Sequence, residues 1–337
     1  MGFKQKIKGF FVETQDEQAT VVTPTAAPAP ETKQEPVKVK KPAPVEAKKS
    51  GKPSALSEMF KLGGTISKKH EVIVGIIGAV ILMLVWYGVT YTGEIIRPQI
   101  LPNPVDVLYS YPDLWQNSDL LWNTWYTIKL NLLGYFYALI IAIPVGLVVG
   151  LFPVTKALFS KYFDAIRYLP IPAVSGIFIA ALGIGFEMKA SFLAFGIIIY
   201  ILPVVVQKII DLQNPSNSKE YVYLQTIETL GATPWQKFRY VYFPYVMHKI
   251  STDIINLTAI SYTYIVIAES LNKEGGIGSL ISIMSRQSRI DAVYALLFLI
   301  IAIGILQDFL LRKLDVAIFP YKYNKPTLWQ RIKQAFK

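Results

Sequence analysis

The sequence contains no cysteine and only two histidines, His70 and His248. The absence of cysteine excludes disulfide frameworks, thiolate metal sites and cysteine nucleophiles, and two histidines are too few for a histidine-cluster metal site. Charged residues are scarce, at 17% of the 337 residues, whereas 53% are hydrophobic. Soluble domains carry about 25% charged residues. The composition therefore argues against an ordinary soluble enzyme and indicates a protein whose solvent is largely lipid.

A phosphate-binding loop of the GxxxxGK[ST] type is also absent from the sequence. The nearest candidate, GGTISKK at 63–69, has the wrong spacing and no strand-to-helix pattern around it. The glycine cluster at 275–278 follows no strand and predicts a tight turn. We therefore expect no cofactor, ATP or Mg²⁺ to bind to this chain itself.

Residues 1–70 differ in composition from the rest of the chain. The stretch 19–53 is rich in alanine, proline and lysine and contains no aromatic residue, which predicts a disordered tether. Ahead of it, residues 1–12 carry phenylalanines and lysines at spacings that fit a short amphipathic helix on anionic lipid. A frayed terminus is the alternative interpretation.

Six apolar stretches follow, each near the length of about 20 residues that crosses a bilayer as a helix. They predict an all-α polytopic membrane domain over 71–320, followed by a basic tail at 321–337. The third and fifth stretches are shorter than a standard span. The six expected spans are 72–93, 126–152, 171–186, 190–206, 254–268 and 293–311.

The distribution of lysine and arginine predicts the orientation in the membrane. With the N-terminus in the cytoplasm, and the long tail left out of the count, 15 basic residues lie inside and 6 outside. Both termini and the loop 207–250 are therefore expected to be cytoplasmic, in a multi-pass protein of the inner (plasma) membrane. We interpret the net charge of +11 as the result of these basic residues on the cytoplasmic side. Nucleic-acid binding is not expected.

The loop 207–250 carries the most informative local pattern. A helix is expected over 220–230, with Gly231 ending it in the left-handed conformation. Thr233 and Pro234 then begin a second helix, which Pro244 is expected to break. The pattern predicts a helix–turn–helix. Its protruding turn, called here the knuckle, would fit into a groove on a soluble partner.

The segment TLGATPWQKFRYVYFP (229–244) closely resembles the cytoplasmic "EAA" loop of ABC importer permeases. That family has a Gly-Ala pair 13 residues before a proline, and Gly231–Ala232 and Pro244 keep this spacing. The Glu-Ala-Ala itself is replaced by Gln225-Thr226-Ile227. LPNPVDV (101–107), RYLPIPA (167–173), LGIGFEMKASFL (182–193) and AESLNKEGGIGSLI (268–281) are similar to further segments of the nitrate/sulfonate/taurine/bicarbonate-type branch. The resemblance covers residues 72–320 in unbroken order.

The resemblance implies partners as well as a fold. Two copies of the chain would form a homodimer in membrane lipid, each copy contacting one of two cytoplasmic ABC ATPase subunits, which bind ATP and Mg²⁺. A solute-binding protein would dock outside. The resemblance assigns contact with the ATPase to these residues of the loop: Thr226, Glu228, Thr229, Gly231, Ala232, Thr233, Pro234, Trp235, Phe238 and Pro244.

Polar residues on the expected spans are candidates for the translocation pathway. Interhelical hydrogen bonds or an aromatic belt are the alternative roles for these side chains. Glu269 has two interpretations, a gate residue or a solvated helix end, and Asp308 is expected to pair with Arg312 four residues on. The pathway candidates are Asn131, Tyr135, Ser175, Ser261, Tyr262 and Glu269.

The expected function is transmembrane permeation for an ATP-driven importer of a small anion or organosulfonate, such as nitrate, bicarbonate, taurine or a sulfonate. The chain is not expected to be an enzyme, because its spans hold no paired carboxylates and no serine–histidine arrangement. An ABC permease for another small solute and an ion-coupled secondary transporter are the alternatives. Few ionisable residues lie in the spans to relay ions, which weighs against the secondary transporter.

Overall fold

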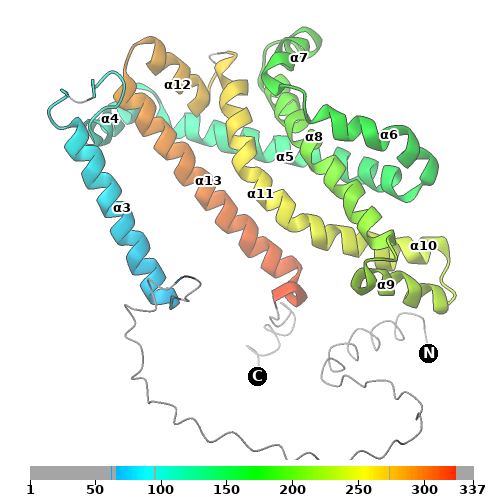
Figure 1. The fold of residues 1–337 in the computed structure, drawn as a ribbon. Coiled ribbons are helices and arrows are strands. Elements are labelled where there is room, and N and C mark those ends of the chain that lie inside the picture. Colours follow the sequence, from blue (N-terminus) through cyan, green and yellow to red (C-terminus); the bar gives the residue numbers. More distant parts are fainter. Residues whose placement is uncertain (1–61, 63–65, 95, 273, 324–337) are drawn as a thin grey trace, which may run out of the picture. The chain divides into compact units, whose positions relative to one another are not determined.

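A computed structural model of the chain describes residues 62, 66–94, 96–272 and 274–323, and every regular element within them is a helix (Figure 1). The chain divides into two units, 1–67 and 68–337, and all the helices described below lie in the second. The all-α prediction is therefore confirmed. The expected tails at 1–70 and 321–337, with the amphipathic segment 1–12, lie almost wholly outside the described residues.

Five helical segments are long and apolar enough to cross a membrane, and they correspond to five of the six expected spans. Each is longer than its apolar stretch, because the helix continues into the flanking polar residues. The first of them begins three residues inside the expected tail. The five are α3 (Lys68–Thr90), α5 (Leu120–Leu151), α8 (Phe186–Gln213), the continuous helical stretch Pro234–Ser270 and α13 (Ile290–Ile318).

The expected third span at 171–186 is wrong as a single helix. The region instead forms α6 (Pro153–Ile166), a short 3₁₀ turn η2 (Ile171–Val174) and α7 (Ser175–Leu182), and the path bends by 103° between α6 and the η2–α7 stretch. Prolines at 170 and 172 have no N–H for a helical ladder, so the helix cannot continue through them. Gly183 then ends α7 with φ +73°. The pair is thus a broken span or a re-entrant loop.

Two further short helices, α4 and α12, also lie outside the expected spans. The first, α4 (Pro104–Asn117), lies between the first and second expected spans, and the second is α12 (Ile277–Arg286). The Asn103 side chain caps α4 by accepting the Val105 N–H at 2.9 Å, and proline follows at the first helical position. The sequence LPNPVDV therefore encodes a helix start.

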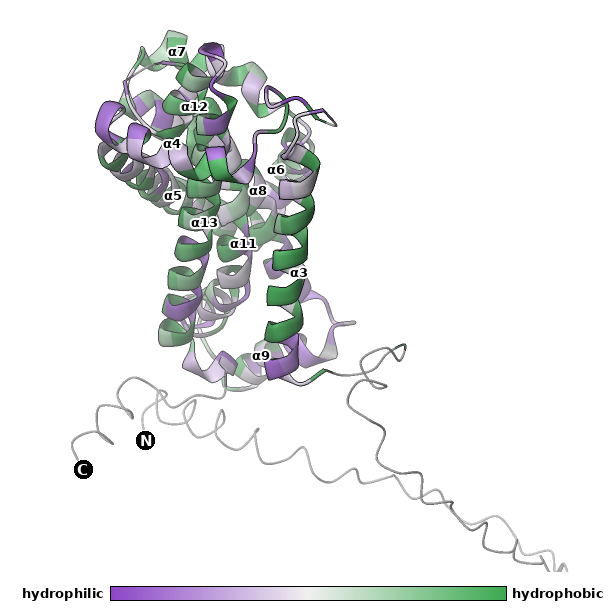
Figure 2. Cartoon of the chain, turned by 90° about the vertical axis from the view of Figure 1, so that its left-hand side faces the viewer, coloured by the Kyte–Doolittle hydropathy of each residue, from purple (hydrophilic) through white to green (hydrophobic). Residues whose placement is uncertain are grey.

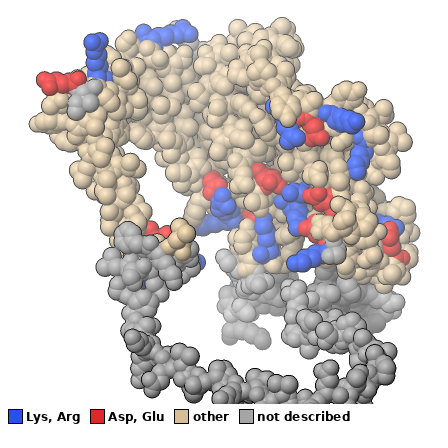
Figure 3. Space-filling model, viewed as in Figure 1, with Lys and Arg blue, Asp and Glu red and all other residues tan. Residues whose placement is uncertain are grey.

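The short helices mark the two ends of the molecule (Figures 1 and 2). Helices α4, α7 and α12 lie at one end, called here the α12 end. At the opposite, α9 end lie α9 (Ser218–Thr229) and α10 (Pro234–Lys237), together with the start of α3 and the end of α13. Figure 3 shows charged side chains gathered around the α9 end and over α6.

Close packing of α5 against α8 forms the centre of the fold. Every fourth residue along one face of α5 is small, which lets the two backbones approach each other. A Cβ atom added at Gly134 would lie 2.6 Å from Leu193 Cδ2, and one added at Gly146 would lie 2.7 Å from Val205 Cγ1. The small residues of this face are Gly134, Ala138, Ala142, Gly146 and Gly150, and all of them are buried.

Among the described residues, helix α3 packs against the rest of the unit near its C-terminal end. Trp86 donates its indole N–H to the Pro102 carbonyl at 3.0 Å. The centroid of its ring lies 5.7 Å from the centroid of the Phe298 ring. Most of the other apolar side chains of α3 are exposed, and Figure 2 shows that hydrophobic residues make up most of the helix. A helix that is apolar all round and uncovered fits a lipid environment and not an aqueous one.

The α5–α8 packing leads to a testable prediction. Gly146→Val should lower the free energy of unfolding by about 1–3 kcal/mol, because the added methyls would overlap Val205. Gly78→Val, on α3, is the matched control, since an added Cβ at Gly78 meets nothing within 4 Å. Thermal unfolding in detergent measures both variants. Equal shifts in the two would contradict the packing described here.

Candidate functional site

The turn between α9 and α10 is closed by backbone hydrogen bonds around a left-handed glycine. Gly231 has φ +68°, a conformation that glycine adopts without strain. Its N–H donates to the Glu228 carbonyl at 2.9 Å, and the Ala232 N–H donates to the Ile227 carbonyl at 3.3 Å. This pair of hydrogen bonds is the Schellman motif, which ends a helix sharply.

Helix α10 begins immediately after this turn. Thr233 Oγ1 accepts the Gln236 N–H at 3.4 Å, and Gln236 Oε1 accepts the Thr233 N–H at 2.8 Å. This reciprocal pair is a capping box, and Pro234 occupies the first helical position, where no N–H is needed. The structure therefore confirms the helix–turn–helix expected from the sequence up to this point.

The turn exposes an aromatic surface at the α9 end. The Trp235 side chain is 69% exposed, although its ring stacks on Phe238 with ring centroids 5.4 Å apart. Beside it, Lys237 Nζ and Glu228 Oε1 form an ion pair at 2.8 Å. Trp235 thus presents a large apolar ring that the described part of the chain leaves mostly uncovered, next to a charge pair.

The hydroxyl groups expected to face the partner bond to their own helix. Thr226 Oγ1 donates to the Val222 carbonyl and Thr229 Oγ1 to the Thr226 carbonyl, each at 2.8 Å. Thr229 is exposed and Thr226 is half-buried, and each hydroxyl keeps an acceptor site for a further hydrogen bond.

Helix α9 is anchored to the membrane-spanning helices by one carboxylate. Glu220 accepts hydrogen bonds from the Tyr245 hydroxyl and from Lys249 Nζ, both on the long helix that follows α10. Burial alone would raise the pKa of Glu220, but the bonds from Lys249 and Tyr245 outweigh burial, so the pKa lies below its ordinary value. The carboxylate therefore stays ionised near neutral pH and holds α9 in place, together with the buried side chains of Leu224 and Ile227.

The expectation that Pro244 breaks the second helix is wrong. After α10 the chain passes through a π-helical turn η3 (Phe238–Tyr242) directly into α11 (Phe243–Ser270), and Pro244 lies in the first turn of α11. Its missing N–H is tolerated because the turn before it is π-helical, with the Phe243 N–H donating to the Phe238 carbonyl. The exposed α10 is therefore one end of a continuous helical rod that crosses the molecule.

Four side chains from three helices form a hydrogen-bond network in the interior. Asn131 on α5 donates to Ser261 Oγ on α11 at 2.9 Å, and Gln307 on α13 donates to Asn131 Oδ1 at 2.9 Å. Tyr262 donates to Gln307 Oε1 at 2.7 Å. These contacts are the interhelical hydrogen bonds named above as the alternative role, and a role in the pathway stays a prediction.

Two of the three remaining pathway candidates, Tyr135 and Ser175, lie in different places. The Tyr135 hydroxyl lies 3.4 Å from Thr258 Oγ1, so it also joins α5 to α11. Ser175 lies at the start of α7, where its hydroxyl donates to the Pro172 carbonyl at 2.8 Å. Ser175 is therefore not part of the interior network.

Glu269 is fully buried, so its interpretation as a solvated helix end is wrong. One carboxylate oxygen accepts the Thr127 hydroxyl at 2.7 Å, and the other accepts the Gly278 N–H at 2.7 Å. Thr127 Oγ1 in turn accepts the Ile277 N–H at 2.9 Å. The carboxylate thus clamps the first turn of α12 against α5 and α11, where the positive end of the helix dipole favours a negative charge.

The glycine cluster before α12 fits this clamp. The Gly276 N–H donates to Asn123 Oδ1 at 2.8 Å, and Gly276 has φ +102°. A Cβ added at Gly276 would lie 2.1 Å from Glu269 Cδ, and one at Gly278 would lie 2.8 Å from Val266 Cα. The tight turn expected here is confirmed, and its glycines are needed because the clamp approaches the backbone so closely.

Sequence reasoning missed Lys189, which is one of the six basic residues counted outside the membrane. It lies in the first turn of α8 and is fully buried, with Nζ 3.2 Å from the Tyr126 hydroxyl and 5.0 Å from the centre of the Tyr126 ring. Lys189 shares a helical face with Phe192, Leu193 and Gly196, all of which are buried. The spacing of three to four residues between Lys189 and these positions is the sequence pattern that could have indicated its burial.

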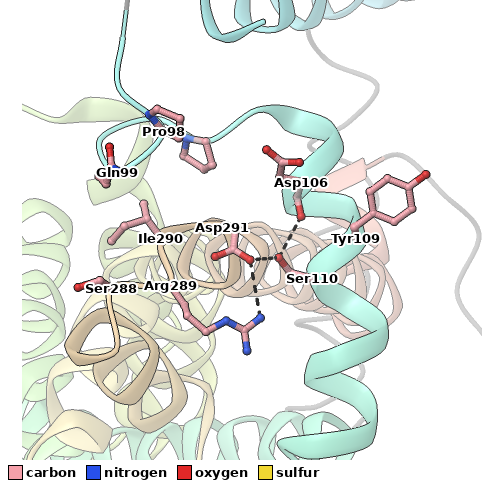
Figure 4. Close-up of a pocket in the computed structure, with 10 residues that line it drawn as sticks. Pro98, Gln99, Asp106, Tyr109, Ser110, Ser288, Arg289, Ile290 and Asp291 are labelled. Carbon is pink, nitrogen blue, oxygen red and sulfur yellow. Dashed lines mark hydrogen bonds and ion pairs between the residues drawn. The ribbon is translucent and has the colours of Figure 1, made fainter. Parts of the chain in front are cut away.

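A polar hollow of about 480 Å³ lies at the α12 end, between α4 and the start of α13 (Figure 4). Arg289 ion-pairs with Asp113 and Asp291, and Ser110 donates to Asp291 Oδ2 at 2.7 Å. Hydrogen bonds from Asn117 and Arg289 lower the pKa of Asp113. The remaining lining residues are Pro98, Gln99, Pro102, Asp106, Tyr109, Ser288 and Ile290.

A further expectation concerns the pair of Asp308 and Arg312. Arg312 bonds to both carboxylate oxygens of Asp308, at 2.7 and 3.0 Å, which confirms the expected pair. Within the described ranges, no group of three or more histidine, cysteine, aspartate or glutamate side chains is placed to hold a metal ion.

Comparisons with known proteins give a consistent result. Residues 142–319 match the family described as "Binding-protein-dependent transport system inner membrane component". The taurine transport system permease protein of Escherichia coli (strain K12) is 24% identical over 246 residues, which is 72% of this chain and 86% of that protein. The putative aliphatic sulfonates transport permease protein of Bacillus subtilis (strain 168) is 20% identical over 255 residues, 76% of this chain and 90% of that protein. A probable ABC transporter permease protein of Brucella melitensis biotype 1 is 24% identical over 230 residues, which is 68% of this chain and 89% of that protein.

The clamp around α12 leads to the second prediction. Gly276→Ala should lower the free energy of unfolding by about 1–3 kcal/mol, because its Cβ would overlap the Glu269 carboxylate and its positive φ strains an alanine. Gly185→Ala is the control, since Gly185 has an extended backbone (φ 172°) and an added Cβ meets nothing within 4 Å. If thermal unfolding in detergent gave the same midpoint for both variants, the clamp would not have the close geometry described.

Proposed function

The chain belongs to the family of inner membrane components of binding-protein-dependent transport systems, and we propose that it is the membrane-spanning subunit of an ATP-driven importer for a small anion. One observation carries the proposal. The α9–α10 turn presents an exposed tryptophan on a helical rod that continues into the membrane domain. Such a surface suits a partner that pushes or pulls on the permease from one side.

The proposed partner at this surface is a cytoplasmic ABC ATPase. The chain contains no phosphate-binding loop of its own, so the energy of ATP must reach it through a protein contact. We assign direct contact to Trp235, Glu228 and the threonines at 226 and 229. The turn around Gly231, Ala232, Thr233 and Pro234 shapes the knuckle, Phe238 supports the tryptophan ring, and Pro244 lets the rod continue.

Two contacts provide the path by which movement reaches the spans. Helix α10 continues through η3 into α11, and Glu220 ties α9 to the same helix through Tyr245 and Lys249. In the proposed mechanism two copies of the chain lie side by side, each with one ATPase. ATP binding draws the ATPases together, and the α9–α10 units tilt α11 between inward-open and outward-open states.

The α9 end is then the cytoplasmic end and the α12 end faces outward. The lysine and arginine distribution supports this orientation, and it places the start of α3 and the end of α13 in the cytoplasm. A solute-binding protein would dock at the α12 end, where the polar hollow around Arg289 and Asp291 opens.

The proposed substrate is a small organic anion of the sulfonate class. The support comes from the two relatives whose names state a substrate, taurine in one case and aliphatic sulfonates in the other. Nitrate and bicarbonate, which belong to the same branch by resemblance, are the inorganic alternatives.

The proposal is tested by isolating the importer and measuring transport. Mild detergent extraction of the tagged chain should recover an ATPase subunit, and proteoliposomes containing both should import radiolabelled taurine only with ATP, Mg²⁺ and the solute-binding protein. Uptake that follows an imposed ion gradient without ATP would support the secondary transporter instead. Competition by methanesulfonate, nitrate and bicarbonate ranks the substrates.

The third prediction isolates the tryptophan. Trp235→Ala should weaken ATPase retention at least about tenfold, as expected when an aromatic residue at the centre of an interface is lost. It should change the free energy of unfolding by no more than about 0.5 kcal/mol, because the side chain is exposed. Trp115→Ala at the α12 end, also exposed, is the matched control. Undiminished retention in Trp235→Ala would remove the assignment.

A further inference from the structure

A lysine just beyond α13 joins the α9 ends of two membrane-spanning helices. The turn η4 (Pro320–Tyr323) places Lys322 Nζ 2.9 Å from Asp315 Oδ2 on α13. The same nitrogen lies 3.1 Å from Ser251 Oγ and 2.7 Å from Thr252 Oγ1, both on α11. A lysine ammonium has three N–H donors, so this arrangement uses all of them and links α13 to α11.

The turn that carries Lys322 is fixed on both sides. The Tyr323 hydroxyl also donates to Asp315 Oδ2, and the Asp315 residue is 4% exposed. The Tyr321 ring lies 5.0 Å from the His248 ring of α11. The cluster is therefore a built contact with charge-assisted hydrogen bonds, which are stronger than those between neutral groups.

The cluster lies next to the anchor of α9. Tyr245 and Lys249 of α11 hold Glu220, and Ser251 and Thr252 follow within the next turn of the same helix. The polar contacts thus run in series from α9 to α11 and from α11 to α13. Near the α9 end of α13, the side chains of Leu310, Leu314 and Ile318 are exposed within the described part of the chain.

We propose that Lys322 is a positioning residue that makes the α9 end of α13 move with α11 when the ATPase displaces the α9–α10 unit. The inference rests on the proposed function, because it needs an ATP-driven movement to transmit. Without the ammonium, the buried Asp315 and the two hydroxyls lose their shared donor. Helix α11 then moves while the end of α13 lags behind.

The test follows each helix separately in the complete complex. The chain contains no cysteine, so single spin labels can be placed at Val222→Cys on α9 or Leu314→Cys on α13, both exposed positions. Each labelled homodimer, bound to its ATPase in nanodiscs, gives one distance between subunits. Double electron–electron resonance compares the nucleotide-free and the ATP–vanadate states. We expect both distances to shift in the otherwise unchanged protein.

In Lys322→Met the expected result is a retained shift at position 222 and a loss of at least half of the shift at position 314. Lys208→Met is the matched control, because Lys208 pairs with Asp253 and so joins α8 to α11, not α13 to α11. It should leave both shifts intact. If Lys322→Met does not assemble, Thr252→Val, which removes one acceptor, is expected to reduce the shift at 314 selectively.

The outcomes separate the inference from the proposed function. A full shift at position 314 in an assembled Lys322→Met complex overturns the role of Lys322 and leaves the importer proposal standing. An equal loss at both positions overturns it too, because a general weakening of the fold would then be the explanation. No shift at position 222 in the otherwise unchanged protein overturns ATP coupling itself, and the inference with it.

Discussion

Lipid offers no hydrogen bonds, and this constraint explains most of the contacts inside the membrane domain. A polar group that lies within a bilayer must find its partner in the protein. Asn131, Gln307 and Tyr262 satisfy one another across three helices, and Glu269 binds Thr127 and the backbone of α12. These contacts keep the helices in a single register, while small residues on α5 allow the backbone approach that dispersion forces require.

The α9 end differs from the interior of the membrane domain in having a large apolar side chain that is exposed. Its polar groups are joined in a chain from Glu220 through α11 to Lys322 and Asp315, whereas the ring of Trp235 is left mostly uncovered. A region whose helices are joined by charge-assisted hydrogen bonds and that has one large apolar contact surface suits the transmission of force from a soluble partner. The continuous path from α10 into α11 removes the hinge that a break at Pro244 would have introduced.

Patterns local in the chain predicted much of the fold and part of the site. Length and hydropathy predicted five of the spans, and the turn at Gly231 and Thr233 followed from capping residues that act within a few positions. The sequence could not predict contacts between distant residues. Glu269 and Thr127 are 142 positions apart and Asn131 and Ser261 are 130 apart, so hydropathy left Glu269 ambiguous and placed Lys189 outside. Hydropathy did not predict the bend between α6 and α7, because it reports only that the stretch is apolar and not that two prolines interrupt the helix. Pro244 was misread because a π-helical turn before it keeps the helix continuous.

The central claim is that the α9–α10 knuckle is where an ATPase engages the permease, and one measurement tests it most directly. A photo-crosslinking amino acid placed at position 235 should, on irradiation of intact membranes, capture a protein that mass spectrometry identifies by its GxxxxGK[ST] loop as an ATPase. The same probe at Tyr109, an exposed residue at the α12 end, should not capture it. Capture of that ATPase from position 109 and not from 235, or a position-235 adduct with lipid alone, would contradict the account.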